Sequence, residues 1–213
     1  PSGTTTSVGG LSSIVKQVLT TYNQTELNNF DGVFRHSNLL SAIDNASPAI
    51  LNSVARVKAY KNVRITSSSL DSHKADFGFK FDGTVNQDNS IISTTGLQIG
   101  GKVTFLEDER IAGDSEKRRI YGYTIDELGR KKRNVLNAGF VYPETGVVDL
   151  AGLVNDADET LTITVRPASD DIVSQKRKIL QIDINKTTIV GDIDNISIAG
   201  SAGLSQYTTF TRN

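Results

Sequence analysis

The N-terminal part of the chain, up to about Leu51, places apolar residues with the period of an α-helix. They recur at spacings of three and four, which predicts a helix with one apolar stripe, preceded by a flexible Ser/Thr/Gly tail. A second, shorter helix is predicted from Ser37 to Ile43 with Ser37 as its cap, and a turn is predicted at Ser47-Pro48. The stripe of the first helix consists of Leu11, Ile14, Val15, Val18, Leu19 and Tyr22.

From Ser53 onward the pattern changes to the period of two that is typical of β-strands, and β-branched residues become common. Alternation predicts a strand over residues 55–60. The phenylalanines at positions 77, 79 and 81 are predicted to face a core from a strand that ends at an Asp82-Gly83 hairpin turn.

The next apolar alternation runs from Leu97 to Phe105 and keeps its parity across Gly100-Gly101. Two glycines inside a strand pattern suggest a bulge or a close backbone approach. We therefore expect one strand that is interrupted but not ended at these glycines.

Further strands follow in the C-terminal half. Pro143 and Gly146 suit a type I turn that would join two strands into a tight hairpin. Leu161, Ile163 and Val165 give the cleanest alternation of the chain, and residues 180–184 and 187–193 predict two more strands. The polar stretch 155–159 is expected to be a loop.

These elements predict an α+β fold in which a short helical N-terminal part precedes a mainly antiparallel β-rich domain. The expected organisation is a flexible tail and helical segment over residues 1–52 and a β-rich domain over residues 53–213. A lobe boundary near residues 155–160 is a possible subdivision.

Composition removes several function classes. The chain has 213 residues and no cysteine, which excludes disulfides, thiolate nucleophiles and cysteine metal sites. A net charge of −1 gives no global field for nucleic acid or an anionic membrane. The longest apolar runs are too short to span a bilayer, so no membrane insertion is expected. The absence of methionine indicates a piece of a longer product.

One local charge feature stands out, the basic runs 117–119 and 130–133, which would flank a hairpin turn near residues 126–129. Like charges would then face each other, unless acidic residues such as the run 107–109 relieve the repulsion. Because Tyr121 and Tyr123 lie between the basic runs, nucleic-acid binding is conceivable, but a solvated or salt-bridged hairpin is the preferred interpretation. We expect no nucleic-acid partner.

The residues offer no catalytic constellation. His36 lies beside Ser37 in a predicted helix, where sequence neighbours do not face each other. His73 stands in a predicted polar loop without further metal ligands nearby. No phosphate loop, dinucleotide fingerprint or nucleophile elbow occurs, so we expect no enzyme, no cofactor and no metal.

The run from Phe34 to Asp44 (FRHSNLLSAID), followed by Ser47-Pro48-Ala49-Ile50, resembles the C-terminal region of the baseplate wedge proteins of T-even-type contractile-tailed bacteriophages. These are the inner-ring subunits, the products of gene six. Later features occur in the same order and extend the resemblance to residues 30–195. They are a long strand from Val54, an Ala138-Gly139 step, the 142–150 hairpin, and Arg166-Pro167 followed by residues 170–173.

The resemblance implies a structural virion protein of the tail baseplate, assembled in the host cytoplasm. It implies homodimers, a ring of dimers around the tail tube, and contacts with other baseplate wedge proteins. The longer N-terminal part that carries much of the partner binding in this family is absent here. The candidate subunit interface consists of Leu11, Ile14, Val15, Val18, Phe34, Leu39 and Leu40, and packing of the α-helical stripe inside the chain is an equal alternative.

Two other function classes stay open. A β-rich host-receptor or carbohydrate-binding tail module would use Tyr60, Tyr121, Tyr123 and Tyr142 as stacking platforms. A glycosidase would use a pair of carboxylates, which a chain with 22% charged residues contains by chance.

Overall fold

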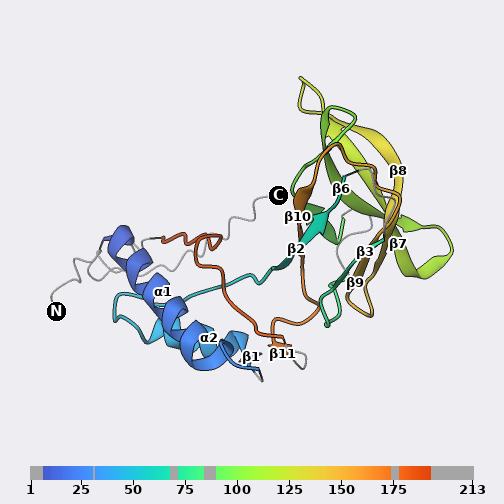
Figure 1. The fold of residues 1–213 in the computed structure, drawn as a ribbon. Coiled ribbons are helices and arrows are strands. Elements are labelled where there is room, and N and C mark those ends of the chain that lie inside the picture. The colour runs from blue at the N-terminus through green and yellow to red at the C-terminus, as the bar shows by residue number, and fades with distance from the viewer. Residues whose placement is uncertain (1–6, 31, 68–71, 84–89, 174–177, 193–213) are drawn as a thin grey trace, which may run out of the picture.

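The computed structural model describes residues 7–30, 32–67, 72–83, 90–173 and 178–192, and it contains a helical part and a β part (Figure 1). The α+β prediction is confirmed, because short helices near the N-terminus precede mostly antiparallel sheets. The helical part contains α1 (Val8–Tyr22), a short π-helix η1 (Asn23–Leu27), β1 (Val33–Phe34) and α2 (His36–Asp44).

Helix α1 confirms the predicted stripe but begins earlier than expected. Ser7 caps it, since the Ser7 Oγ accepts a hydrogen bond from the backbone N–H of Gly10 at 3.2 Å. The two glycines ahead of Leu11 are therefore helical rather than part of a flexible tail. Leu19 and Tyr22 are the buried residues of the helix.

The predicted cap of α2 is wrong. The helix begins at His36, and Ser37 is exposed inside its first turn. The backbone N–H of His36 instead donates to the carboxylate of Asp171 at 2.9 Å, while Arg35 forms an ion pair with the same carboxylate at 2.9 Å. A residue 135 positions away in the chain thus caps the helix, which local sequence could not reveal. The turn at Ser47 is confirmed by the hydrogen bond from the Ile50 N–H to the Ser47 carbonyl.

The β part consists of two antiparallel sheets. One has six strands in the order β3-β9-β8-β7-β6-β5, and the other has three in the order β2-β10-β4. The strands of both sheets are β2 (Ala59–Ile65), β3 (His73–Asp76), β4 (Ile92–Thr94), β5 (Leu97–Ile99), β6 (Lys102–Ile111), β7 (Asp114–Ile125), β8 (Lys131–Tyr142), β9 (Val147–Leu150) and β10 (Glu159–Val165).

A shared core joins the two sheets. Leu106 and Val148 from the six-stranded sheet and Ile163 from the three-stranded sheet are all fully buried in the same cluster. The Leu106 N–H also donates to Thr94 Oγ1 at 2.9 Å, so β6 and β4 are tied directly. Burial of this aliphatic surface is the main stabilising contribution to the β part.

Several strand predictions are confirmed. Strand β10 carries the predicted alternation and buries Leu161, Ile163 and Val165. Residues 143–146 join β8 to β9 as a hairpin, and the Gly146 N–H donates to the Tyr142 carbonyl at 2.9 Å. The stretch 155–158 is a loop, as expected, and Glu159 begins the next strand.

Other strand predictions are wrong. Gly100 and Gly101 do not form a bulge but the turn of a hairpin between β5 and β6, with φ of 58° and 70°. Such left-handed angles match the twist of a two-residue hairpin turn. The N–H groups of both glycines donate to the Asp156 carboxylate at 2.9 and 2.7 Å, which fixes the turn.

The phenylalanine row faces the core as predicted, but it lies after a strand rather than in one. Strand β3 ends at Asp76, and Gly78 has a φ of 78°, which breaks the extended backbone. Phe77 and Phe81 are buried, and their rings meet edge to face with centroids 5.3 Å apart. The strand expected beyond Asp82-Gly83 falls on residues 84–89, outside the described part.

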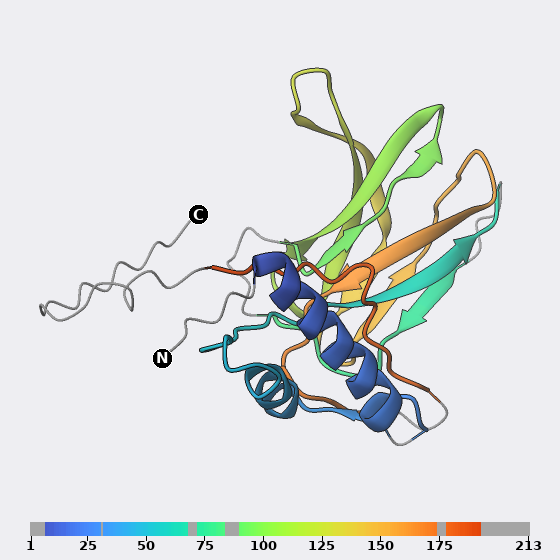
Figure 2. The same ribbon diagram turned by 90° about the vertical axis from the view of Figure 1, so that its left-hand side faces the viewer.

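The chain returns to the helical part after β10, which the sequence did not predict. Strand β11 (Ile172–Val173) pairs with β1, and residues 178–192 run beside the helices without forming a strand (Figures 1 and 2). The strand predicted at 180–184 is therefore wrong. The strand predicted at 187–193 is wrong for residues 187–192, and residue 193 lies outside the described residues. Leu180, Ile182 and Ile184 pack instead on the core of the helical part.

Candidate assembly surface

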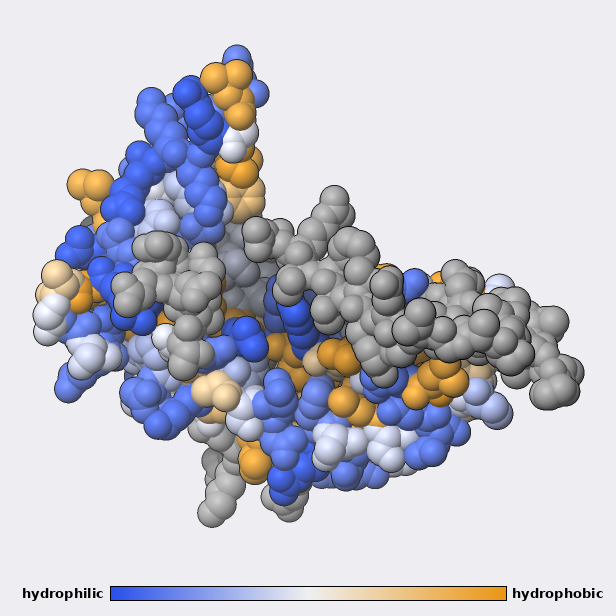
Figure 3. All heavy atoms as spheres, turned by 180° about the vertical axis from the view of Figure 1, so that it is seen from behind, coloured by the Kyte–Doolittle hydropathy of each residue, from blue (hydrophilic) through white to orange (hydrophobic). Residues whose placement is uncertain are grey.

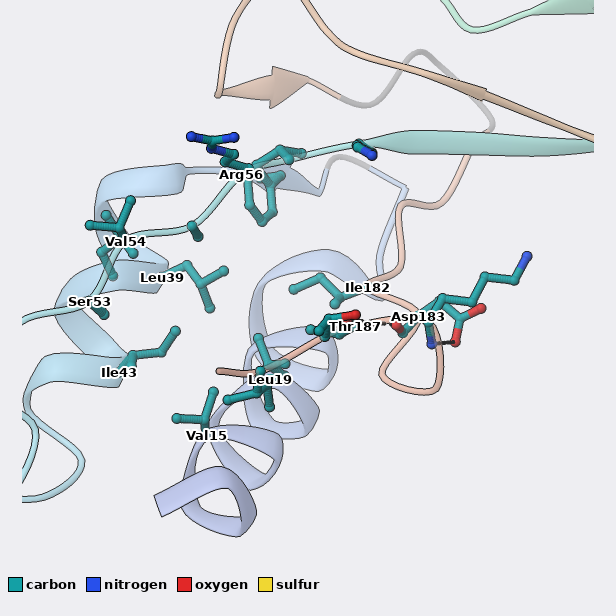
Figure 4. A pocket seen from close by; sticks show the side chains of 18 of the residues that line it. Val15, Leu19, Leu39, Ile43, Ser53, Val54, Arg56, Ile182, Asp183 and Thr187 are labelled. Carbon is teal, nitrogen blue, oxygen red and sulfur yellow. Dashed lines mark hydrogen bonds between the residues drawn. The ribbon is translucent and has the colours of Figure 1, made fainter. Parts of the chain in front are cut away.

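A groove of 2050 Å³ opens between the two helices and two extended segments of the helical part. Its floor includes Val15 and Leu19 of α1 and Leu39 and Ile43 of α2, and Figure 4 shows these side chains turned toward the same space. Residues 48–61 form one wall and residues 178–192 contribute to the other. We call this feature the apolar groove.

The apolar groove carries much of the exposed aliphatic surface of the described residues. Leu51, Val54 and Val190 are 74%, 85% and 86% exposed, respectively. Val8, Val173 and Ile179 add smaller exposed areas to the same lining. Seen from behind in Figure 3, hydrophobic side chains occupy the recess between the β part and the helical part. Clustered exposed aliphatic side chains of this kind mark surfaces that bind other molecules.

The charged residues of the groove are mostly basic. Among the described residues, five cations line it against two carboxylates, although the whole chain has a net charge of −1. They are Arg56, Lys58, Lys61, Lys178 and Lys186, with Asp183 and Asp192. The apolar groove is therefore locally positive.

Two of these charged groups have displaced pKa values with clear causes. Burial, followed by the nearby ammonium of Lys178, lowers the pKa of Lys61. The hydroxyl of Tyr60 donates to the Asp183 carboxylate at 2.6 Å and thereby lowers the pKa of Asp183. Asp183 is thus already engaged, while the positive charges at Lys61 and Lys178 repel each other.

Long-range polar contacts hold the groove walls on the helices. Asn23, only 8% exposed, donates from its side-chain amide to the Ile182 carbonyl at 2.9 Å and accepts from the Ile182 N–H at 2.7 Å. The Tyr22 hydroxyl exchanges two hydrogen bonds with the backbone of Arg35 at 3.0 and 3.1 Å. These contacts fix α1 against both the C-terminal wall and the start of α2.

The structure gives the seven predicted interface residues different degrees of burial and divides them between two hollows. Phe34 and Leu39 are buried in the core of the helical part, where they also line the apolar groove. Leu11, Val15 and Leu40 are half-buried and line the apolar groove. The remaining two, Ile14 and Val18, are also half-buried but line a separate, shallower hollow of 530 Å³ between α1 and α2.

The basic hairpin does not pair in the predicted way. Strands β7 and β8 are long, so residues 131–133 lie opposite 123–125, while Arg118 and Arg119 lie opposite Val141 and Phe140. The two basic runs therefore do not face each other, and the predicted like-charge contact is wrong. The preferred interpretation, a salt-bridged hairpin, is confirmed, since acidic residues of β6 pair with the second basic run: Lys131 with Glu107 at 2.6 Å and Arg133 with Glu109 at 2.7 Å.

Three of the four candidate stacking tyrosines have a cation over the ring. Lys131 lies 4.5 Å from the ring centroid of Tyr123, Arg133 lies 4.0 Å from that of Tyr121, and Lys186 lies 3.8 Å from that of Tyr60. The hydroxyls of Tyr121 and Tyr123 both donate to Glu107, each at 3.1 Å. Partial burial and then the Glu107 charge raise the pKa of both phenols. These rings are therefore engaged within the chain.

The two histidines take structural positions. His36 Nε2 lies 3.1 Å from the Ala55 carbonyl oxygen, between α2 and one wall of the groove. His73 begins strand β3 instead of lying in the predicted loop. Among the described residues, no group of three or more acidic or histidine side chains could hold a metal ion, and no helix is long and apolar enough to cross a membrane.

Sequence reasoning missed the two walls of the groove. Residues 51–58 show strand-like alternation, but the described chain gives them no strand partner, and residues 180–184 show the same signal. An alternating segment without a partner cannot be recognised from periodicity, because the pattern reports only which side chains are covered.

Comparison with known proteins agrees with the resemblance in the sequence. Residues 2–62 match the family model of the baseplate structural protein gp6, C-terminal domain III. The match includes α1, α2 and the wall residues 51–58. No curated protein matches the chain. The matched family is one of structural baseplate proteins, which supports a structural role, a tail-baseplate location in the virion and contacts with other baseplate proteins.

Proposed function

We propose that this chain is a structural subunit of a phage tail baseplate that associates with copies of itself and with other wedge proteins to build the ring around the tail tube. One observation carries the proposal: the segment that matches the baseplate family, residues 2–62, also supplies α1, α2 and the exposed side chains Leu51 and Val54. Assembly in the host cytoplasm belongs to the same proposal.

Self-association is proposed to use the flank of α1 that faces away from the apolar groove. Ile14 and Val18 line the shallow hollow there beside Ala42 and Ala46. Small alanine side chains allow close approach of a second helix, and aliphatic side chains release water when they are covered. Leu11, Val15 and Leu40 extend the apolar area toward the groove.

Sedimentation velocity on the whole chain tests this proposal. We expect a dimer of twice 23.0 kDa at low micromolar concentration, because obligate interfaces bury about 2,000–5,000 Å². Ile14→Asp would place a charge in the contact and weaken the dimer about tenfold or more. The matched control is Ser13→Asp on the exposed side of the same helix. Monomers at every concentration, or equal behaviour of the two variants, would contradict the proposal.

A host-receptor or carbohydrate-binding module is the other function considered from the sequence. It would need free aromatic faces, whereas the rings of Tyr60, Tyr121 and Tyr123 carry cations. A glycan array distinguishes the two functions, because the scaffold proposal expects no hits. We propose no catalytic role for the chain.

A further inference from the structure

Residues 51–58 form an extended segment whose backbone is unpaired in the described structure. It leads into β2, and its side chains alternate between exposed at positions 52, 54, 56 and 58 and half-buried at 53, 55 and 57. Within the described residues it makes no backbone–backbone hydrogen bond; its one polar backbone contact is that of Ala55 with His36. Unpaired strand-like backbone of this kind is a template for another strand.

The His36 contact shows which edge of the segment is already occupied. In an extended chain the N–H and C=O of one residue point to the same edge, and those of its neighbours point to the opposite edge. The carbonyl of Ala55 faces α2 through His36, so the backbone groups of Val54 and Arg56 point to the other edge. A strand added at that edge would run along the wall of the apolar groove.

The side chains around this edge define what the added strand should carry. Leu51, which is 74% exposed, and Val57, which packs against the core of the helical part, have the opposite parity to Arg56, so their face of the segment calls for aliphatic partners. Arg56 and Lys58 are exposed and form no ion pair with a described residue, and Lys61 and Lys186 add positive charge to the same groove. A second copy would bring the same positive charge to the contact, whereas carboxylates would neutralise it.

We propose that residues 51–58 accept an extended segment of another protein, with acidic and aliphatic side chains in alternation, as an added β-strand. Main-chain hydrogen bonds supply affinity in this mode, and the alternating side chains supply specificity. The inference deepens the proposed function, on which it rests, by naming the kind of partner that a baseplate subunit binds at the apolar groove.

Fluorescence anisotropy with a labelled octapeptide of alternating Glu and Val tests the inference on the whole chain. We expect saturable binding that weakens as salt is added, because exposed charges are screened. The same peptide with Lys in place of Glu should not bind. Arg56→Gln should weaken binding about threefold, as expected for one exposed charge contact.

Proline substitutions test the strand pairing itself. Val54→Pro removes an N–H that has no hydrogen-bond partner among the described residues, so the melting temperature should stay unchanged while binding weakens about tenfold. Ala55→Pro is the matched control, because its N–H points to the edge that faces His36, and it should bind like the unaltered chain. In that unaltered chain, amide exchange should slow at Val54 and Arg56 but not at Ala55 when the octapeptide is added.

Three results would overturn the inference: equal binding of the Lys peptide, equal binding by the two proline variants, or no amide protection at Val54. Sedimentation of the same samples keeps the two proposals apart. A monomer that binds the octapeptide contradicts self-association alone. If the chain forms a dimer that does not bind the octapeptide, and Val54→Pro dissociates this dimer, then a second copy occupies the edge. That result contradicts the inference about an acidic partner but not the proposal of self-association.

Discussion

Asp108 and Arg118 form a buried ion pair that ties three strands together, and removing its carboxylate should strongly destabilise the β part. The side chain of Asp108 on β6 is fully buried, and that of Arg118 on β7 is only 8% exposed. Asp108 Oδ2 accepts from Arg118 Nε, and Oδ1 accepts from the Ile92 N–H at 2.8 Å and from Ser90 Oγ at 2.5 Å. The carboxylate therefore connects β4, β6 and β7.

Asp108→Asn preserves the size of the side chain but removes the negative charge that Asp108 places against the buried guanidinium of Arg118. Breaking one side of a buried pair costs about 3–5 kcal/mol in the free energy of unfolding. With a slope of about 2–3 kcal/mol per M in urea, the midpoint should fall by about 1–2.5 M. Since the chain has no tryptophan, the transition is followed by near-UV tyrosine circular dichroism, to which Tyr121 and Tyr123 contribute.

Two further variants make the test specific to buried charge. Glu144→Gln breaks the exposed pair with Lys80, whose side chains are 71% and 64% exposed, and should change stability by about 1 kcal/mol or less. The double variant Asp108→Asn with Arg118→Met removes both charges while the amide oxygen can still accept from the Ile92 N–H, and it should be more stable than Asp108→Asn alone. If Asp108→Asn lies within about 1 kcal/mol of the unaltered chain, desolvation of this pair is not a large contribution.

Two more predictions concern the turns and caps. Gly146→Ala should cost at least about 2 kcal/mol by urea denaturation, because φ is +69° and an added Cβ would lie 1.8 Å from the Phe79 carbonyl oxygen. Gly113→Ala, at φ +79° with open space around it, should cost clearly less, and equal losses would refute the clash argument. Asp171→Ala should lower the melting temperature at pH 7. The His36 N–H lowers the pKa of Asp171, so its stabilising contribution is complete above the unfolded pKa of about 3.9 and is lost as pH falls through the lower folded value. The melting temperatures of variant and unaltered chain should therefore converge near pH 2, and a constant difference across pH would contradict this assignment.

Sequence periodicity predicted the elements whose pattern reflects burial on one face. The stripe of α1 and the alternation of β10 are confirmed because their apolar side chains face a core directly. The same signal at 180–184 led to a wrong strand. Ile182 is covered by the helical core and held by Asn23, so it has the burial of a strand residue without a strand partner.

Contacts between distant residues account for the remaining differences. The cap of α2 comes from Asp171, and the Gly100-Gly101 turn is fixed by Asp156. Local sequence contains no trace of either partner. The candidate surface was predicted only in part, since Leu11 and Val15 belong to the expected stripe while its most exposed residues, such as Val54 and Val190, lie on segments that were predicted to be strands.

The return of the chain after β10 means that the β part is an insertion, entered through residues 51–58 and left through residues 169–171, since residues 166–168 still pair with residues 80–82 of the β part. The N-terminal and C-terminal segments of the described chain both pack in the helical part. They are held there by the pairing of β1 with β11 and by the two hydrogen bonds between Asn23 and the backbone of Ile182. A protease cut in either crossing would therefore nick the molecule without separating its halves. Because two covalent connections join the parts, rotation of the β part relative to the helical part is restricted, and a force applied to one part is transmitted to the other. A single connection would allow free rotation.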